Sequence, residues 1–234
     1  ATATQPCKGE EQMRAVSSIH SRIKAQRDVD DVTDRPAEPP APRSDRPPAV
    51  MLIVATAGFA VNFWAWALLS PLGPLFRTNG TLGKISESDV ALLVAVPVIV
   101  GSLGRIPIGA LTDRFGGRVM FPLVSAATIV PVLFIGCFAL DSYAALLVGG
   151  FFLGLGGTTF AVGVPFVNAW FPPERRGFAV GIFGAGMGGT AISALTTVQL
   201  FNPVGNRATF VITAVALAVY ALVAWTVLRD APGR

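Results

Sequence analysis

Long apolar stretches with short polar connections dominate the chain. Six of them follow one another, at residues 50–76, 90–111, 119–140, 142–173, 177–206 and 208–228. Each reaches or exceeds the roughly 20 residues that an α-helix needs to cross a bilayer. Strands of a membrane barrel would alternate polar and apolar residues over about ten positions, and these stretches do not alternate. The pattern predicts an all-α membrane protein with six transmembrane helices.

Polar segments flank the predicted bundle of residues 50–228 on both sides. Residues 1–49 are polar, rich in proline toward their end and without apolar periodicity. Such a composition is typical of disorder, so we expect a disordered cytoplasmic N-terminal tail. Residues 229–234 are again polar, and we expect them to begin a cytoplasmic connector.

Composition and charge exclude other classes of protein. Hydrophobic residues make up 52% of the chain and charged residues 14%, against roughly 25% charged residues in a soluble domain. Residues 1–49 carry eight basic and eight acidic residues, so the net charge of +4 belongs to the membrane part. Its basic residues are scattered over short loops and form no patch suited to nucleic acid. We therefore expect the lipid bilayer as a partner and no nucleic acid.

The basic residues of the loops predict the orientation in the membrane. Cytoplasmic loops carry an excess of Lys and Arg. The side that holds both chain ends has Arg114, Arg118, Arg175, Arg176, Arg229 and Arg234, and the opposite side has only Arg77, Lys84 and Arg207. The sequence thus predicts a multi-pass protein of the cytoplasmic (inner) membrane with both termini in the cytoplasm.

Residues for catalysis or metal binding are missing from the six stretches. The only histidine, His20, lies in the tail together with Cys7, and Cys137 stands alone in the third stretch. No stretch contains His, Asp or Glu, which supply general bases and metal ligands. We expect neither an enzyme nor a metal or cofactor.

Arg105 is the only charged residue within the six stretches. It precedes Asp113, expected at the cytoplasmic interface, by eight residues, which places it about 12 Å deep in a core of about 30 Å. Secondary transporters bind their substrates near this depth, and a planar guanidinium matches the oxygens of a small planar anion. The alternative is a structural arginine held by an ion pair or by carbonyl groups. A functional role is favoured because the stretches hold no carboxylate.

The segment after the second stretch carries a recognisable motif. It reads Gly109-Ala-Leu-Thr-Asp113-Arg114-Phe-Gly116-Gly117-Arg118 and resembles the G-x-L-x-D-R-x-G-R-[KR] loop of the major facilitator superfamily. Glycine permits close helix approach or a tight turn, and Asp113 can cap a helix N-terminus or pair with an arginine. In that family the acid and the arginines hold the cytoplasmic gate closed in the outward-facing state. The resemblance implies a gating motif of Gly109, Asp113, Arg114, Gly116 and Arg118; an ordinary basic turn is the alternative.

Within that superfamily the chain resembles the bacterial nitrate/nitrite porters. Three segments carry the resemblance, residues 63–74, residues 101–109 and the glycine-rich residues 156–190. In those porters an arginine of the second helix binds the anion and an aromatic residue of the fourth packs against it, which implies these roles for Arg105 and Phe160. The fifth-helix signature implies substrate contacts at Gly184, Gly186 and Met187. An asparagine commonly occupies this glycine cluster, where the present chain has Met187.

Glycines recur at helical spacing in two of the stretches. Helix packing is one interpretation, because small residues let helices approach closely in membranes. The other is that Gly184, Gly186 and Gly189 let the fifth helix slide against a neighbour and bring its backbone to the anion. The two spaced sets are Gly150, Gly154, Gly157 and Ala161, and Gly177, Gly181, Gly184 and Gly188.

Six helices are half of the twelve that the resemblance implies. In such transporters two pseudo-symmetric halves form the site between them. The sequence therefore predicts the N-terminal half of a major facilitator fold. We expect a secondary active transporter of nitrate, nitrite or both, a symporter or antiporter working by alternating access with a second six-helix half. The alternatives are a transporter of another small inorganic or organic anion, and a non-transporting membrane scaffold or sensor with the same fold.

Overall fold

The computed structural model describes Lys24 and residues 47–79, 82, 85–204 and 207–231. The tail predicted for residues 1–49 lies outside this part except for Lys24 and residues 47–49. Within it the chain is helical and has no strand. The elements are α2 (Pro48–Trp66), α3 (Leu69–Asn79), α4 (Glu87–Phe115), α5 (Gly117–Phe134), η1 (Ile135–Ala139), α6 (Tyr143–Leu153), η2 (Gly154–Thr158), α7 (Thr159–Trp170), α8 (Pro173–Gly184), η3 (Ala185–Gly188), α9 (Gly189–Val204) and α10 (Ala208–Val227).

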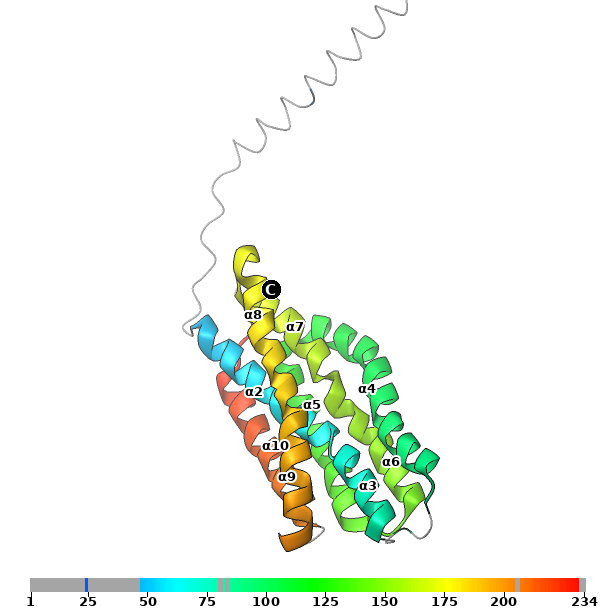
Figure 1. The fold of residues 1–234 in the computed structure, drawn as a ribbon. Helices are drawn as coiled ribbons and strands as arrows, with labels where there is room; N and C mark the ends of the chain where they lie inside the picture. The colour runs from blue at the N-terminus through cyan, green and yellow to red at the C-terminus, as the bar shows by residue number, and fades with distance from the viewer. Residues whose placement is uncertain (1–23, 25–46, 80–81, 83–84, 205–206, 232–234) are drawn as a thin grey trace, which may run out of the picture. The chain divides into compact units, whose positions relative to one another are not determined.

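Six helices of the described part are long and apolar enough to span a membrane, which confirms the predicted number (Figure 1). They cover Pro48–Arg77, Glu87–Phe115, Gly117–Ala139, Tyr143–Trp170, Pro173–Thr197 and Ala208–Val227. We call them the first to sixth membrane helix. Their bounds differ from the predicted stretches mainly at the polar ends, because a helix continues past its apolar part into the interface.

Two predicted loops are shorter than expected for this reason. Asp113 and Arg114 lie in the last turn of α4, and Arg175 and Arg176 in the first turn of α8. Pro173 begins α8. Proline is favoured at the first position of a helix, because the N–H that it lacks would have no partner within the helix there and its φ is already helical. The loop assignment of these four residues, and of Arg118 in the first turn of α5, was therefore wrong. The prediction that these residues lie near the ends of the membrane helices is kept.

Irregular turns interrupt four of the helices that the sequence presents as continuous. The first membrane helix is broken at Ala67 and Leu68, between α2 and α3. The third membrane helix ends in the π-helical turn η1, and the fourth and fifth contain the 3₁₀ turns η2 and η3. Both 3₁₀ turns are glycine-rich, and glycine weakens the regular α-helix. Short 3₁₀ segments inside a helix often mark hinges.

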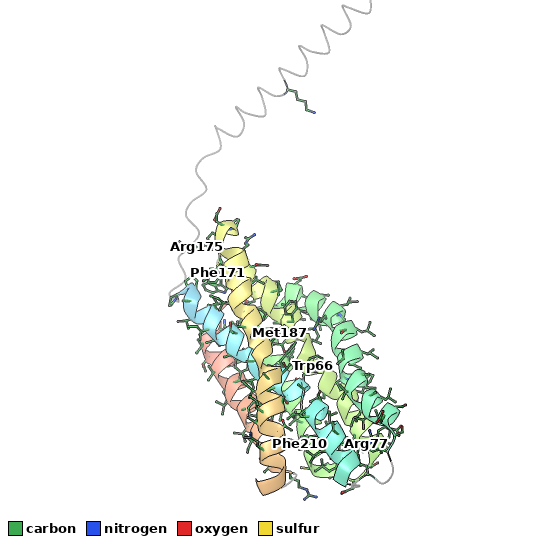
Figure 2. The ribbon with its side chains drawn as sticks, in the orientation of Figure 1. Trp66, Arg77, Phe171, Arg175, Met187 and Phe210 are labelled. Atoms are coloured by element: carbon green, nitrogen blue, oxygen red, sulfur yellow. The ribbon has the colours of Figure 1, made fainter. Side chains whose placement is uncertain are left out.

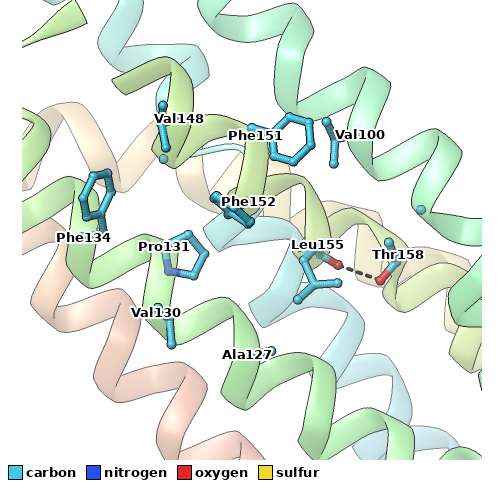
Figure 3. Close-up of a pocket in the computed structure, with 12 residues that line it drawn as sticks. Val100, Ala127, Val130, Pro131, Phe134, Val148, Phe151, Phe152, Leu155 and Thr158 are labelled. Carbon is cyan, nitrogen blue, oxygen red and sulfur yellow. Dashed lines mark hydrogen bonds between the residues drawn. The ribbon is translucent and has the colours of Figure 1, made fainter. Parts of the chain in front are cut away.

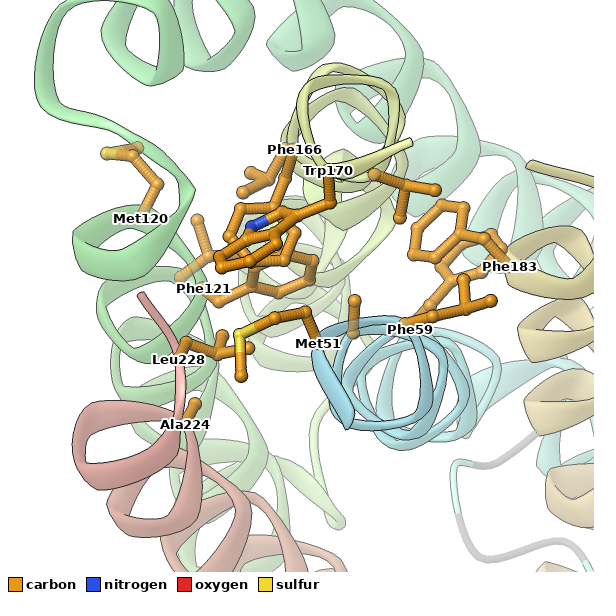
Figure 4. Packing of buried hydrophobic residues seen from close by; sticks show 14 of the residues in the cluster. Met51, Phe59, Met120, Phe121, Phe166, Trp170, Phe183, Ala224 and Leu228 are labelled. Carbon is orange, nitrogen blue, oxygen red and sulfur yellow. The ribbon is translucent and has the colours of Figure 1, made fainter. Parts of the chain in front are cut away.

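α2 is the central element of the bundle. It contacts α5, α7, α8, α9 and α10 as well as both 3₁₀ turns. One apolar cluster surrounds its first half and includes Met51, Phe59 and Phe183, together with side chains of α5, α7 and α10 (Figure 4). A second cluster lies toward the other end and joins α3, η1, α6 and α10. Figure 2 shows Trp66 and Met187 midway between Arg175 at one end of the bundle and Arg77 at the other.

Glycines of the fourth membrane helix pack closely against α2, α3 and α4, as the packing interpretation predicts. A Cβ on Gly154 would stand 2.9 Å from the Pro97 carbonyl oxygen, and one on Gly157 would stand 3.0 Å from Nε1 of Trp66. The fifth membrane helix differs. A Cβ on its spaced glycines would have no neighbouring atom within 4 Å in the described structure, so their face is not packed in this half. These residues are Gly177, Gly181, Gly184 and Gly188.

A candidate anion site around Arg105

Arg105 projects from α4 onto the middle of the fourth membrane helix. Its Nε donates to the carbonyl oxygen of Gly157 in η2 at 3.4 Å, and its Cζ lies 5.5 Å from the centroid of the Phe160 ring. Gly104 lets α4 approach the fourth membrane helix closely here, because a Cβ on this residue would stand 3.0 Å from Cγ2 of Thr158. The arginine and the aromatic residue that the resemblance pairs are thus in contact.

The hydrogen bond to Gly157 bears on the alternative that Arg105 is a structural arginine held by carbonyls. At 3.4 Å the bond is longer than the usual 2.7 to 3.2 Å and uses only the Nε donor. In the described structure it is the sole hydrogen bond of this guanidinium, which leaves the terminal N–H donors available. The only ion pair found among the described residues joins Arg77 and Glu87. Arg105 is therefore a half-buried cation with donors to offer and no carboxylate against it.

Phe160 separates Arg105 from an aromatic cluster. The residue is 36% exposed, and its ring packs against Phe59 of α2 and Phe183 of α8 at centroid distances of 5.7 and 6.3 Å. Sequence reasoning missed Phe59 and Phe183, because one phenylalanine in an apolar helix resembles any other. Only the distances across three helices distinguish them.

The glycine-rich turn of the fifth membrane helix divides into two faces. Gly184 and Met187 face open space, Met187 being 55% exposed. Gly186 is buried, and a Cβ there would stand 2.6 Å from Cδ1 of Phe59; a Cβ on Gly189 would overlap the Ala60 carbonyl oxygen. The three glycines proposed to let this helix slide therefore differ in their surroundings, since Gly186 and Gly189 pack against α2 and Gly184 does not. Residues two apart in a helix point about 200° from each other. Gly186 is a packing residue turned away from the open side.

The open side of this turn offers few hydrogen-bond donors. Met187 stands where the nitrate signature commonly has an asparagine, and its thioether is only a weak acceptor. The Thr190 hydroxyl is engaged with the Met187 carbonyl oxygen at 2.9 Å. The open side of this turn therefore adds no free side-chain donor at Met187 or Thr190.

The predicted gating motif lies at the end of the bundle where α4 turns into α5. Gly116 makes this turn with φ +83°, a conformation that favours glycine. Gly117 does not turn the chain but begins α5, and a Cβ there would overlap the Phe166 ring. The close approach expected at Gly109 does not occur in this half, since a Cβ there would have no atom within 4 Å. Asp113 is exposed in the last turn of α4, and Arg114 lies over the Phe115 ring.

Asp230, which sequence reasoning missed, joins the predicted connector to this motif. Its Oδ1 accepts a hydrogen bond from the backbone N–H of Arg118 at 3.1 Å, in the first turn of α5. A carboxylate in that place is favoured by the partial positive charge of a helix N-terminus. Beside it the Arg229 carbonyl oxygen accepts a hydrogen bond from Nε1 of Trp170 at 3.2 Å. An acid two residues after the last apolar stretch was the available signal, but nothing in the sequence names its partner.

Comparison with known proteins agrees with this architecture. The sequence profile of the Major Facilitator Superfamily matches residues 55–234. The chain belongs to the Major Facilitator Superfamily. This is a superfamily of transporters and not of enzymes, and the six apolar helices agree with a multi-pass membrane protein.

Several relatives within the superfamily have names that mention nitrate or nitrite. The chain is 51% identical to the probable nitrate/nitrite transporter NarK2 of Mycobacterium tuberculosis (strain ATCC 25618 / H37Rv) over 185 residues, which cover 79% of this chain and 46% of the relative. It is 37% identical to the nitrite extrusion protein of Bacillus subtilis (strain 168) over 174 residues, or 74% and 42% of the two chains. The chain thus spans about half the length of these relatives.

Solved structures of the superfamily show the same fold. A bacterial homolog of the human lysosomal transporter Spinster, in an inward-facing and unoccupied conformation, matches with a TM-score of 0.65 and 20% identity. The match covers 81% of this chain and 45% of that structure. Six helices of this chain therefore correspond to about half of a superfamily transporter.

An apolar cavity lies apart from the contact between Arg105 and Phe160. It has a volume of about 530 Å³ and lies between α4, α5, α6 and η2 (Figure 3). Its lining is apolar except for Thr158, whose hydroxyl donates to the Leu155 carbonyl oxygen at 2.7 Å. A cavity that contains no cation and no free hydrogen-bond donor cannot offset the free-energy cost of dehydrating an anion. Its exposed phenylalanines, Phe151 and Phe152, suit the acyl chains of a bilayer.

Proposed function

We propose that this chain forms the N-terminal half of a secondary transporter that moves nitrate, nitrite or both across the cytoplasmic membrane by alternating access. The observation that carries the proposal is Arg105, a half-buried cation of α4 whose terminal N–H donors make no hydrogen bond in the described structure and which has no carboxylate against it. A relative named as a probable nitrate/nitrite transporter, 51% identical, and one named as a nitrite extrusion protein, 37% identical, support the choice of anion.

Arginine suits these anions better than lysine would. Nitrate and nitrite present oxygens in one plane, and a guanidinium donates two parallel hydrogen bonds in one plane. Arginine also stays charged in a site of low dielectric constant, where a lysine can lose its proton. The Phe160 ring next to Arg105 provides a flat surface against which a planar anion can lie.

A second six-helix half would complete the site. Only 17% of the most apolar part of the second membrane helix and 28% of the fifth is buried in this bundle, against 56% for the third and fourth. The uncovered sides include the unpacked glycines Gly181 and Gly184 and the exposed Met187. We propose that the second half packs against these helices and supplies further anion ligands.

The gating motif and the orientation complete the proposal. Arg114, Arg118, Arg175 and Arg176 lie at the membrane end where α2 begins and α10 ends, and we place that end in the cytoplasm. There Asp113, with Arg114 and Arg118, would hold the cytoplasmic gate in the outward-facing state. The contact between Asp230 and Arg118 ties the start of the connector to this gate.

Anion flux in proteoliposomes tests the proposed function. The complete transporter, this chain with its second half, is reconstituted and uptake of labelled nitrate is measured against competing nitrite, chloride, sulfate and formate. We expect competition by nitrite and little by the others. Competition by a different anion would select the alternative substrate class. Absence of any anion flux in correctly inserted protein would favour the scaffold or sensor.

A further inference from the structure

Three phenylalanine rings connect the fifth membrane helix to Arg105. Phe59 of α2 and Phe183 of α8 stack face to face, with centroids 4.7 Å apart and planes 15° apart (Figure 4). Both rings are fully buried, and Phe160 of α7 packs against each of them. Arg105 lies over the Phe160 ring. The buried pair therefore backs the ring that the arginine contacts.

Two glycines make room for the two buried rings, which are held between the helices. Phe183 fills the space left by Gly163, one turn after Phe160 on the same helix, where a Cβ would overlap its ring. Phe59 in turn fills the space left by Gly186 on the fifth membrane helix. The rings are thus interlocked, because each occupies a gap in a helix other than its own. Close packing of this kind permits little ring movement.

Phe160 itself lacks such confinement. The residue is 36% exposed, so packing on the buried side of its ring is what defines the position of the ring. The arginine in turn has only one long hydrogen bond, to Gly157, besides its contact with this ring. Any shift of Phe160 toward the space of Phe183 would withdraw the ring from the guanidinium.

We propose that Phe183 is a positioning residue for the anion site: it holds the Phe160 ring against Arg105 and so fixes the direction in which the guanidinium donates. The inference rests on the proposed function of Arg105. It gives the fifth membrane helix a role in anion affinity through a buried side chain that does not touch the anion. Movement of this helix during transport would then alter the anion site directly.

Two substitutions of Phe183 in the complete transporter test this role. Phe183→Leu removes the ring, and Phe183→Met keeps more volume in case the smaller side chain prevents folding. Losing a cation–π contact of about 0.5 to 2 kcal/mol corresponds to roughly a 2- to 30-fold rise in Kd. We expect such a rise for nitrate, measured by calorimetry on purified protein. A wild-type Kd in the folded Leu or Met variant would overturn the inference.

Phe210 provides a matched control. It is also fully buried, and it fills the gap left by Gly136 in the same manner, but it lies in the other apolar cluster. Phe210→Leu should lower the thermal stability about as much as Phe183→Leu and leave the nitrate Kd unchanged. If both variants weakened binding equally, general loosening of the bundle would explain the effect and the positioning role would be wrong.

A double variant separates positioning from an independent contribution. If Phe183 acts through Phe160, Phe160→Leu combined with Phe183→Leu should bind nitrate no more weakly than Phe160→Leu alone. Losses that multiply would contradict the inference. The proposed function fails separately, since it fails if wild-type protein binds no nitrate or if Arg105→Lys binds normally. If wild-type protein binds nitrate and Arg105→Lys binds it weakly, a wild-type Kd in Phe183→Leu would contradict only the positioning role.

Discussion

A guanidinium in the middle of a membrane helix costs free energy unless something compensates its charge. The described contacts of Arg105 are one carbonyl oxygen and one aromatic face, and neither carries a full negative charge. The anion site that we propose would supply the missing negative charge. By contrast Arg77, at a membrane end, has Glu87 at 2.7 Å and is neutralised within the half. The two arginines thus differ in whether a described carboxylate neutralises them, which is why only Arg105 is proposed to bind an anion.

Asp230 is a second residue whose role depends on a single contact. Asp230→Ala should destabilise the bundle by about 1 kcal/mol, because the first turn of α5 loses its acceptor and the negative charge at its N-terminus. Asp230→Asn should lose less, since an oxygen remains to accept from the Arg118 N–H. Thermal unfolding of the purified protein measures both. Asp141→Asn, at an exposed acid before α6, is the control and should change little; an equal effect there would argue against a specific cap.

Glycine-rich helices show what spacing predicts at the scale of elements. The repeats at intervals of four and three residues correctly indicated faces without side chains, because helical geometry fixes which positions share a face. The spacing did not indicate which helix, if any, packs against each of these faces. In the fourth membrane helix the face meets α2 and α4, whereas in the fifth it meets no neighbour in the described half. The 3₁₀ turns were also missed, since hydropathy does not register a local change in helical hydrogen bonding.

A pair of substitutions in the fifth membrane helix separates packing from function. Gly186→Leu should destabilise the half, because the added side chain would collide with the Phe59 ring. Gly184→Leu should leave insertion and folding intact, since no atom lies within 4 Å of the new Cβ, yet abolish transport by obstructing the open side. Thermal unfolding and nitrate uptake of both variants decide this. Normal uptake by Gly184→Leu would show that its face is turned to lipid.

The last turn of α4, which holds Asp113, yields a kinetic prediction. Asp113→Asn should slow the interconversion of outward- and inward-facing states while leaving nitrate affinity within a few-fold. The proposed role of the acid is to hold helix ends at the gate, about 12 Å along the helix from Arg105. Exchange rates and equilibrium binding on the same reconstituted protein measure the two effects. Parallel losses of rate and affinity would count against a gating role.

At the scale of the whole molecule, hydropathy predicted the fold because a bilayer allows few alternatives to apolar helices of about 20 residues. The six predicted stretches became six membrane helices, whose ends moved and some of which contain irregular turns. The contact of Arg105 with Phe160 also followed, through the resemblance. Phe59, Phe183 and Asp230 could not be foreseen, because their partners lie on other helices and no local pattern encodes a contact across the bundle.

Orientation in the membrane is testable without substrate. In a background with Cys7→Ser and Cys137→Ser, single cysteines are introduced by Glu174→Cys at the start of α8 and by Ser86→Cys at the start of α4. The basic residues near Glu174 predict that this end is cytoplasmic. An impermeant thiol reagent added to intact cells should therefore label only the Ser86→Cys protein, and both variants once the cells are opened. The reverse pattern would invert the topology.

Binding of nitrate to Arg105→Lys in the purified complete transporter tests the central claim most directly. Lysine keeps the positive charge but replaces a planar pair of donors with one point charge, so at least one charge-assisted hydrogen bond of about 1.5 to 3 kcal/mol is lost. We predict a protein with near-normal thermal stability whose nitrate affinity falls roughly ten- to a hundredfold. A variant that is unstable but binds nitrate and nitrite with wild-type affinity would contradict the anion site and the substrate class that depends on it.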